Sequence, residues 1–139
     1  MDDMFRPLRR YADFSGRASR REYWLFALLQ FLLIFAVIAL GMTIFGGIFD
    51  SFAHGGSGGH IMVGLFVVLI FGLLIPNIAV QVRRFHDQDM SGWFVLLHLI
   101  PYVGGLITFV FMLRSGTYGE NRFGPDPYEA DEAVAEIFA

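Results

Sequence analysis

The 139-residue chain has no cysteine and no lysine, and only 17% of its residues are charged. The absence of cysteine excludes disulfide frameworks, thiolate chemistry and cysteine-based zinc sites. Ordinary soluble domains carry about 25% charged residues, so this chain has few of the groups that keep a protein surface hydrated. The formal net charge of −3 is too small to indicate a nucleic-acid partner. Apolar residues instead make up 55% of the chain, and sixteen residues are phenylalanine, which indicates lipid as the surrounding solvent.

Three long apolar runs occupy 23–49, 61–82 and 92–113. Each reaches the length of about 20 residues that a helix needs to cross a hydrocarbon core. The runs lack the polar residue at every third or fourth position that a soluble helix shows on its outer face. We therefore predict a single all-α integral membrane domain over 1–139, with three transmembrane helices.

The third run is interrupted by the sequence IPYVGG. Proline is tolerated within transmembrane helices, so we favour a full third span that is kinked at Pro101. The alternative is a shallow re-entrant hairpin, which would return the turn-rich and acidic tail, 114–139, to the side from which the run entered.

Arginine placement predicts the orientation of the chain. Six of the ten arginines precede residue 22, whereas the glycine-rich loop between the first two runs has none. The arginine-rich interfacial segment 1–22 and the second loop, which carries Arg83 and Arg84, should therefore face the cytoplasm. A full third span would then place the tail on the opposite side. Within the first segment, the apolar spacing around Met4 and Leu8 predicts a short amphipathic helix at the membrane surface.

Three polar blocks lie beside the apolar runs: FSGRASRREYWLF at 14–26, VRRFHDQDMSGWF at 82–94 and GTYGENRFGPDP at 116–127. In this order they resemble a bacterial inner-membrane family known as domain of unknown function 805. The resemblance covers the chain from about Phe14 to Pro127. It implies a small multi-pass protein of the bacterial inner membrane and carries no activity. It does not extend to the acidic end of the chain.

The first block combines helix capping with positive charge. Ser15 or Ser19 can cap the start of the first run, and Glu22 follows Ser19 at the spacing of a capping box. Basic residues at this level suit anionic lipids, and a bound head group or a partner protein is the more specific interpretation. The candidate contact residues in this block and the next are Arg17, Arg20, Arg21, Arg83 and Arg84.

The second block carries the candidate cluster His86, Asp87 and Asp89. These residues could form a metal or proton-transfer site, but neighbours on a helix do not share a face, so we expect no metal there. We favour a structural turn in which Asp87 clamps Arg84 and Ser91 caps the following helix. This turn should interlock with the arginines of the first block.

The third block is rich in glycine, asparagine and proline, which predicts a compact series of tight turns that docks against the helix ends or a partner. Arg122 lies between Glu120 and Asp126, which suggests a local ion pair. The residues of this motif are Gly116, Thr117, Gly119, Asn121, Arg122, Gly124 and Asp126.

Two polar residues, Gln30 and His98, lie within the predicted spans. A histidine without a carboxylate chain nearby is a poor proton path, so we expect both side chains to serve helix packing, with His98 bonded to a carbonyl or to Gln30.

The sequence shows no nucleophile with its base and no cofactor fingerprint. We therefore expect a non-enzymatic membrane protein without a cofactor, which acts through contacts as an accessory or scaffold subunit or as a homo-oligomer. The second hypothesis is a protein that binds or transports lipid or a small solute. A membrane metalloenzyme that uses the His86 cluster is the third. Anionic membrane lipids are expected partners in any of these cases.

Overall fold

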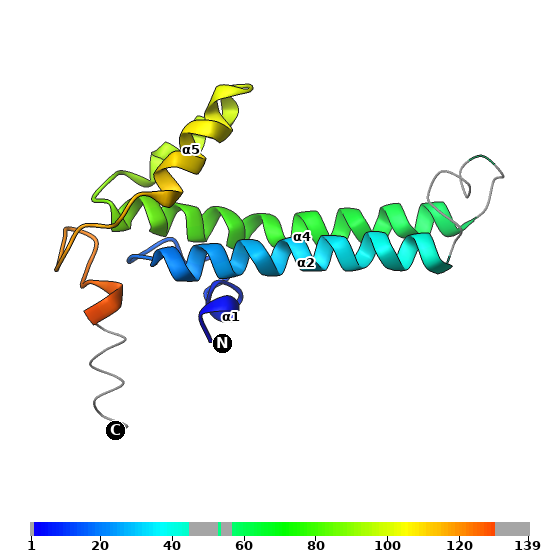
Figure 1. Ribbon diagram of the computed structural model, residues 1–139, viewed down its shortest axis with the longest axis horizontal. Helices are drawn as coiled ribbons and strands as arrows, with labels where there is room; N and C mark the ends of the chain where they lie inside the picture. Colours follow the sequence, from blue (N-terminus) through cyan, green and yellow to red (C-terminus); the bar gives the residue numbers. More distant parts are fainter. Residues whose placement is uncertain (1, 45–52, 54–56, 130–139) are drawn as a thin grey trace. The chain divides into compact units, whose positions relative to one another are not determined.

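The computed structural model describes residues 2–44, 53 and 57–129. Regular structure in this part of the chain is helical, apart from one isolated bridge between Asn121 and Gly124. The expected helical ends of the first run, 45–49, and the acidic end, 130–139, lie outside the described residues. The elements are α1 (Asp2–Arg9), α2 (Arg20–Ile44), α4 (Ser57–Asp87), the 3₁₀ helix η1 (Gly92–Leu99) and α5 (Val103–Leu113), as Figure 1 shows.

The chain divides into two compact units. The first unit combines 1–26 with 76–139, and it contains every polar block. The second unit, 27–75, contains the apolar parts of α2 and α4. In this unit large apolar side chains are exposed, and the rings of Phe31 and Phe35 stack with their centroids 6.4 Å apart.

Two described helices are long and apolar enough to cross a membrane, namely Arg20–Thr43 and Val63–Asp87. Only 11% and 17% of their most apolar stretches are buried. The core helix of a soluble protein would be mostly buried, so this exposure fits helices that face lipid. The first two predicted spans therefore correspond to helices of suitable length and surface.

The expected amphipathic helix at the N-terminus is α1, Asp2–Arg9. Its Asp3 carboxylate lies 3.2 Å from the Arg21 guanidinium at the start of α2, and 3.8 Å from that of Arg6. Pro7 lies inside this short helix and is buried. These contacts join α1 to the beginning of α2.

The third apolar run does not form the single helix, kinked at Pro101, that we favoured. It forms η1 and α5, which are joined by a turn at 100–102 and pack against each other (Figure 1). Tyr102 at the turn has φ of 64°, a left-handed conformation that breaks the helix. A Cβ atom on Gly104 would overlap the Leu97 carbonyl of η1, so only glycine permits this close return.

Aromatic side chains connect this hairpin, η1 with α5, to the end of α4. Phe85 of α4 lies 5.9 Å from Phe94 of η1 and 6.0 Å from Phe111 of α5, between ring centroids. Phe85 is fully buried. The side chain of Gln88, just after α4, also donates a 2.8 Å hydrogen bond to the Phe111 carbonyl. As a result, Leu113 at the end of α5 lies close to the start of α2, where the Arg20 guanidinium is 3.5 Å from the Leu113 carbonyl.

Candidate functional site

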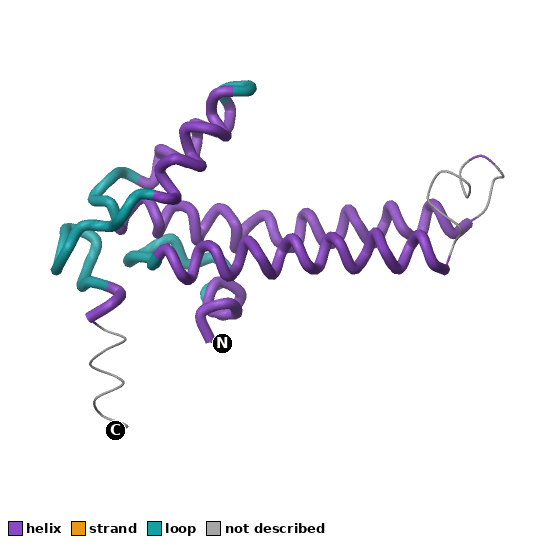
Figure 2. Tube along the Cα trace, in the orientation of Figure 1, coloured by secondary structure: helices purple, strands orange, loops and turns teal. Residues whose placement is uncertain are grey.

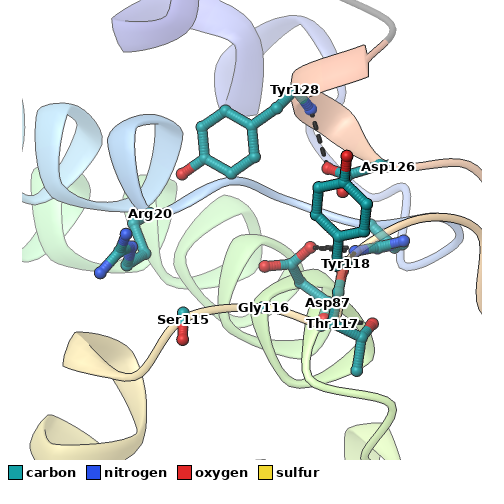
Figure 3. Close-up of a pocket in the computed structure, with 9 residues that line it drawn as sticks. Arg20, Asp87, Ser115, Gly116, Thr117, Tyr118, Asp126 and Tyr128 are labelled. Carbon is teal, nitrogen blue, oxygen red and sulfur yellow. Dashed lines mark hydrogen bonds and ion pairs between the residues drawn. The ribbon is translucent and has the colours of Figure 1, made fainter.

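The three polar blocks meet within the first unit, at the C-terminal end of α4 (Figures 2 and 3). The first block supplies the loop before α2, the second supplies the last turn of α4, and the third supplies the loop that follows α5. The expected interlocking of the second block with the first is confirmed by a hydrogen bond from the Ala18 amide to the Arg83 carbonyl, at 3.0 Å.

The loop before α2 is shaped by Asp13. Its carboxylate accepts hydrogen bonds from the amide and hydroxyl of Ser15, at 3.0 and 2.5 Å, and from the Arg10 guanidinium. The Ser15 hydroxyl and the Arg10 guanidinium hold the pKa of Asp13 well below its usual range. Two residues after Ser15 the chain reaches Arg17, whose side chain turns inward and is buried.

The centre of the site is the Asp87 cluster, which we define as Asp87, Arg17 and Arg84. The Arg17 Nε donates to one Asp87 oxygen at 3.0 Å, and the Arg84 guanidinium donates to the other. All three side chains are at most 1% exposed. The expected clamp of Arg84 by Asp87 is thus confirmed, and Arg17 joins it from 70 residues away.

The third block closes over this cluster by satisfying the end of α4. The backbone amide and the hydroxyl of Thr117 both donate to the Asp87 carbonyl, and the side-chain Nδ2 of Asn121 donates to the His86 carbonyl at 2.9 Å. The last carbonyls of a helix have no partner within the helix, so the tail loop acts as its C-terminal cap. Arg17 fixes the same loop by donating to the carbonyls of Thr117 and Gly119, each at 2.5 Å.

Two positions of the third block require glycine for structural reasons. A Cβ atom on Gly116 would overlap the Asp87 carboxylate, so the backbone could not approach the cluster with a larger residue there. Gly124 has φ of 131°, which side chains disfavour, and it exchanges backbone hydrogen bonds with Asn121. Asp126 completes the turn, because its carboxylate accepts from the amides of Gly119 and Tyr128. The prediction of a compact loop docked on the helix ends is confirmed.

A second buried ion pair lies on the other side of the first block. The Glu22 carboxylate is 3.0 Å from the Arg83 guanidinium, and neither side chain is more than 1% exposed. Within the described residues the Arg83 guanidinium makes no hydrogen bond, so the attraction of Glu22 compensates its charge. Ser19 caps α2, as predicted, because its hydroxyl accepts from the Glu22 amide at 3.1 Å. The sequence indicated Glu22 only as part of that cap, and its role as counter-ion was missed.

His86 and its neighbours form a more exposed edge of the site. The His86 ring stacks on Phe123 with centroids 3.8 Å apart, and its Nδ1 lies 3.2 Å from the Gly16 carbonyl. A carbonyl only accepts, so Nδ1 carries the proton in this contact. Arg122 lies over the outer face of the loop, with its guanidinium 4.8 Å from the centre of the Phe123 ring and 3.0 Å from the Asp89 carboxylate.

The structure corrects the expected partner of Arg122 and shows how His86, Asp87 and Asp89 are arranged. Arg122 pairs with Asp89 rather than with Glu120 or Asp126. His86, Asp87 and Asp89 do not converge, since each has a different partner, and no three His, Asp or Glu side chains in the described residues are arranged to hold a metal.

Of the five arginines proposed to contact lipid or a partner, only Arg20 and Arg21 are exposed. Arg17, Arg83 and Arg84 are buried in ion pairs, because each has a carboxylate within reach inside the protein. Of the two partners expected for His98, the structure shows a backbone carbonyl: His98 Nδ1 lies 3.2 Å from the Val95 carbonyl of its own helix. Gln30 lies in α2 and is half-buried.

The contacts of the tail loop bear on the choice between a full third span and a re-entrant hairpin. Arg17 precedes α2, and Thr117 follows α5, yet their side chain and carbonyl are in hydrogen-bond contact. Two groups in contact cannot lie on opposite faces of a bilayer about 30 Å thick. The contact therefore favours the re-entrant alternative, in which the tail loop returns toward the arginine-rich first block.

Together these features define a small helical membrane protein whose polar motifs form a buried ionic cluster at the end of a long apolar helix. The chain belongs to the family described as "Protein of unknown function (DUF805)", whose model matches residues 11–125. This confirms the resemblance carried by the three blocks.

Two relatives from Escherichia coli (strain K12) support the membrane assignment. The chain is 42% identical over 131 residues to "Inner membrane protein YhaH", an alignment that covers 91% of this chain and 97% of the relative. It is 35% identical over 120 residues to "Inner membrane protein YhaI", which covers 86% of this chain and 90% of that relative. No solved structure matches the chain significantly. The similarity supports a location in the bacterial inner membrane.

Proposed function

We propose that the protein spans the inner membrane twice, through α2 and α4, and that η1 and α5 form a re-entrant hairpin. Both polar ends of the chain then face the cytoplasm. The placement of arginine supports this topology, because all ten arginines lie in 1–22, at 83–84 or after α5, on one side. A full third span would instead place Arg114 and Arg122 outside, against the positive-inside tendency.

In this topology the protein acts through contacts with other membrane proteins or with further copies of itself, as a non-enzymatic accessory or scaffold subunit. The observation that carries the proposal is the exposed hairpin. None of the eight residues of η1 is buried, Trp93 is 77% exposed, and Tyr102 at the turn is 100% exposed. The polar motifs, by contrast, are directed at one another inside the first unit.

The turn of the hairpin explains why a protein partner is needed. With a rise of 1.5 Å per residue, the 11 residues of α5 extend about 16 Å, roughly half of the hydrocarbon core. Non-helical backbone at such depth is stable only where protein or water covers it. A partner helix that packs over Leu106 and the turn at 100–102 would supply this cover.

The proposal is tested with a photo-crosslinking amino acid placed in cells at Leu106 of α5, which is 65% exposed. The matched control is Tyr118, an exposed residue of the tail loop. We expect one discrete protein adduct from Leu106, identified as a second copy by two differently tagged chains or as one other protein in fixed ratio. The same adduct should be absent from Tyr118.

Adducts with lipid alone from Leu106, and likewise from Val110 on the same helix, would contradict the contact function. The buried clusters would be untouched by that result, because both positions are exposed and neither belongs to an ion pair.

A further inference from the structure

A cavity of about 180 Å³, lined in part by charged side chains, opens beside the Asp87 cluster (Figure 3). A water molecule takes about 30 Å³ of liquid volume, so the cavity is far larger than one water and suits a small polar group. Its wall combines the first block, the end of α4 and the tail loop. The lining residues that bear on its chemistry are Arg17, Arg20, Asp87, Ser115, Asp126 and Tyr128.

Arg20 differs from the other arginines at this site. Arg17 and Arg84 are buried, and each pairs with one oxygen of the Asp87 carboxylate. Arg20, by contrast, is exposed. Its described hydrogen bond, to the Leu113 carbonyl, is long at 3.5 Å. In Figure 3 the hydroxyl of Tyr128 extends toward the side of the cavity on which Arg20 lies. Arg20 is therefore a cation at the rim of a cavity, with hydroxyl donors from Ser115 and Tyr128 in the same wall.

The charges around the cavity favour an anion. Arg17 and Arg20 line it and Arg84 touches its wall through Asp87, which gives three guanidinium groups against the carboxylates of Asp87 and Asp126. Both Asp87 oxygens already accept from guanidinium groups, and Asp126 accepts from two backbone amides. These contacts weaken the repulsion that the carboxylates would exert on a second anion. The small positive excess suits a monoanion better than a group with two full charges.

From this arrangement we propose that the cavity binds a phosphate group, with Arg20 as the main counter-ion and Ser115 and Tyr128 as hydroxyl donors. Planar guanidinium groups recognise phosphate oxygens through paired hydrogen bonds. Arg20 is also the first residue of α2, and the N-terminal end of a helix attracts negative charge.

The position of the cavity allows two sources of phosphate. Arg20 begins one apolar helix, and Leu113 ends another, so the rim lies where apolar helices give way to polar loops. A phospholipid head group with a phosphodiester occupies this level of a membrane, and soluble phosphate in the cytoplasm also reaches it. The phosphate site itself does not depend on the proposed contact function, and the proposed topology bears only on which source supplies the phosphate.

The test uses the full-length protein, purified in detergent and stripped of lipid. Binding of short-chain phosphatidylglycerol and of inorganic phosphate is measured separately by titration calorimetry, for the wild type and for Arg20→Gln. The matched control is Arg21→Gln, which removes the neighbouring exposed arginine, paired with Asp3 outside the cavity. A third variant, Tyr128→Phe, removes one hydroxyl.

We expect Arg20→Gln to weaken phosphate binding about tenfold or more, as the loss of a charged hydrogen-bond donor implies, whereas Arg21→Gln leaves it within about twofold. Tyr128→Phe should weaken it by a smaller factor. Binding of the lipid alone assigns the site to a head group, and competition by inorganic phosphate assigns it to soluble phosphate.

Three results would overturn the proposal: no binding of either probe to the wild type, unchanged binding by Arg20→Gln, or equal losses in the Arg20 and Arg21 variants. The last result would mean diffuse attraction to a basic surface. Thermal unfolding of both variants checks that they are folded, which we expect because neither arginine belongs to a buried ion pair.

Discussion

Replacing Asp87 by asparagine changes the Asp87 cluster in one atom and one charge. The carboxylate accepts from Arg17 and Arg84, and all three side chains are at most 1% exposed. Asparagine keeps the shape and one acceptor oxygen, but it leaves two guanidinium groups in the interior without a negative partner. The substitution therefore separates the charge of Asp87 from its volume.

The size of the stability loss depends on the hydrogen bonds that Arg17 and Arg84 keep in the variant. Removing one partner of a buried ion pair typically costs about 3–5 kcal/mol. Arg17 keeps its bonds to the carbonyls of Thr117 and Gly119, and Arg84 keeps its bond to the Arg114 carbonyl. These remaining acceptors offset part of the loss, so we expect Asp87→Asn to lower the free energy of unfolding by about 3 kcal/mol, the lower end of that range.

The matched control is Asp89→Asn, two residues along the chain. Asp89 pairs with Arg122 at 3.0 Å, but the two side chains are 47% and 60% exposed, so this substitution should cost only about 0–1 kcal/mol. Both free energies are measured by unfolding in mixed micelles with increasing sodium dodecyl sulfate. Equal effects of the two substitutions would refute the claim that the Asp87 cluster is a buried ionic core.

Two further substitutions test the packing and the second ion pair in the same unfolding assay. Gly116→Ala should lower the free energy of unfolding by about 1–3 kcal/mol, because the added methyl group overlaps Asp87. The control is Gly105→Ala, which should be neutral or slightly stabilising, because no atom lies within 4 Å of its Cβ position. Equal effects would argue against the close approach at Gly116. Glu22→Gln should lower the free energy of unfolding by about 3–5 kcal/mol, because it leaves the buried Arg83 without a negative partner. Glu22→Leu combined with Arg83→Met should recover most of that loss, since a buried ion pair can be replaced by apolar groups. A double variant as unstable as Glu22→Gln would contradict this reasoning.

The helices were largely predictable because their signal is local. Apolar runs of more than 20 residues require only length and composition, and α2 and α4 match the first two runs apart from a few residues at their ends. Capping was also predictable, since Ser19 and Ser91 bond to amides two or three residues away. The sequence IPYVGG indicated that the third helix is interrupted, but the same residues can produce either a kinked helix or a reversal of the chain.

The site depended on contacts that no local pattern contains. Arg17 and Asp87 are 70 residues apart in the sequence, and Thr117 of the tail loop that covers them lies 30 residues after Asp87. These bonds decide that the third run reverses, because they hold the tail beside the first block. Periodicity also does not show whether an arginine beside an apolar run faces lipid or a buried carboxylate. For this reason Arg83 and Arg84 were assigned to the membrane surface, and Glu22 was taken for a cap alone.

The central claim is that all three polar blocks share one side of the membrane, and the absence of native cysteine makes it directly measurable. Single cysteines are introduced at Ser57, at the start of α4, at Ser91, and at Tyr118, which is exposed in the tail loop. Intact cells are treated with a maleimide that does not cross the inner membrane. We predict labelling at Ser57 only, with Ser91 and Tyr118 labelled after the membrane is permeabilised. Labelling of Tyr118 in intact cells, together with protection of Ser91, would contradict the account.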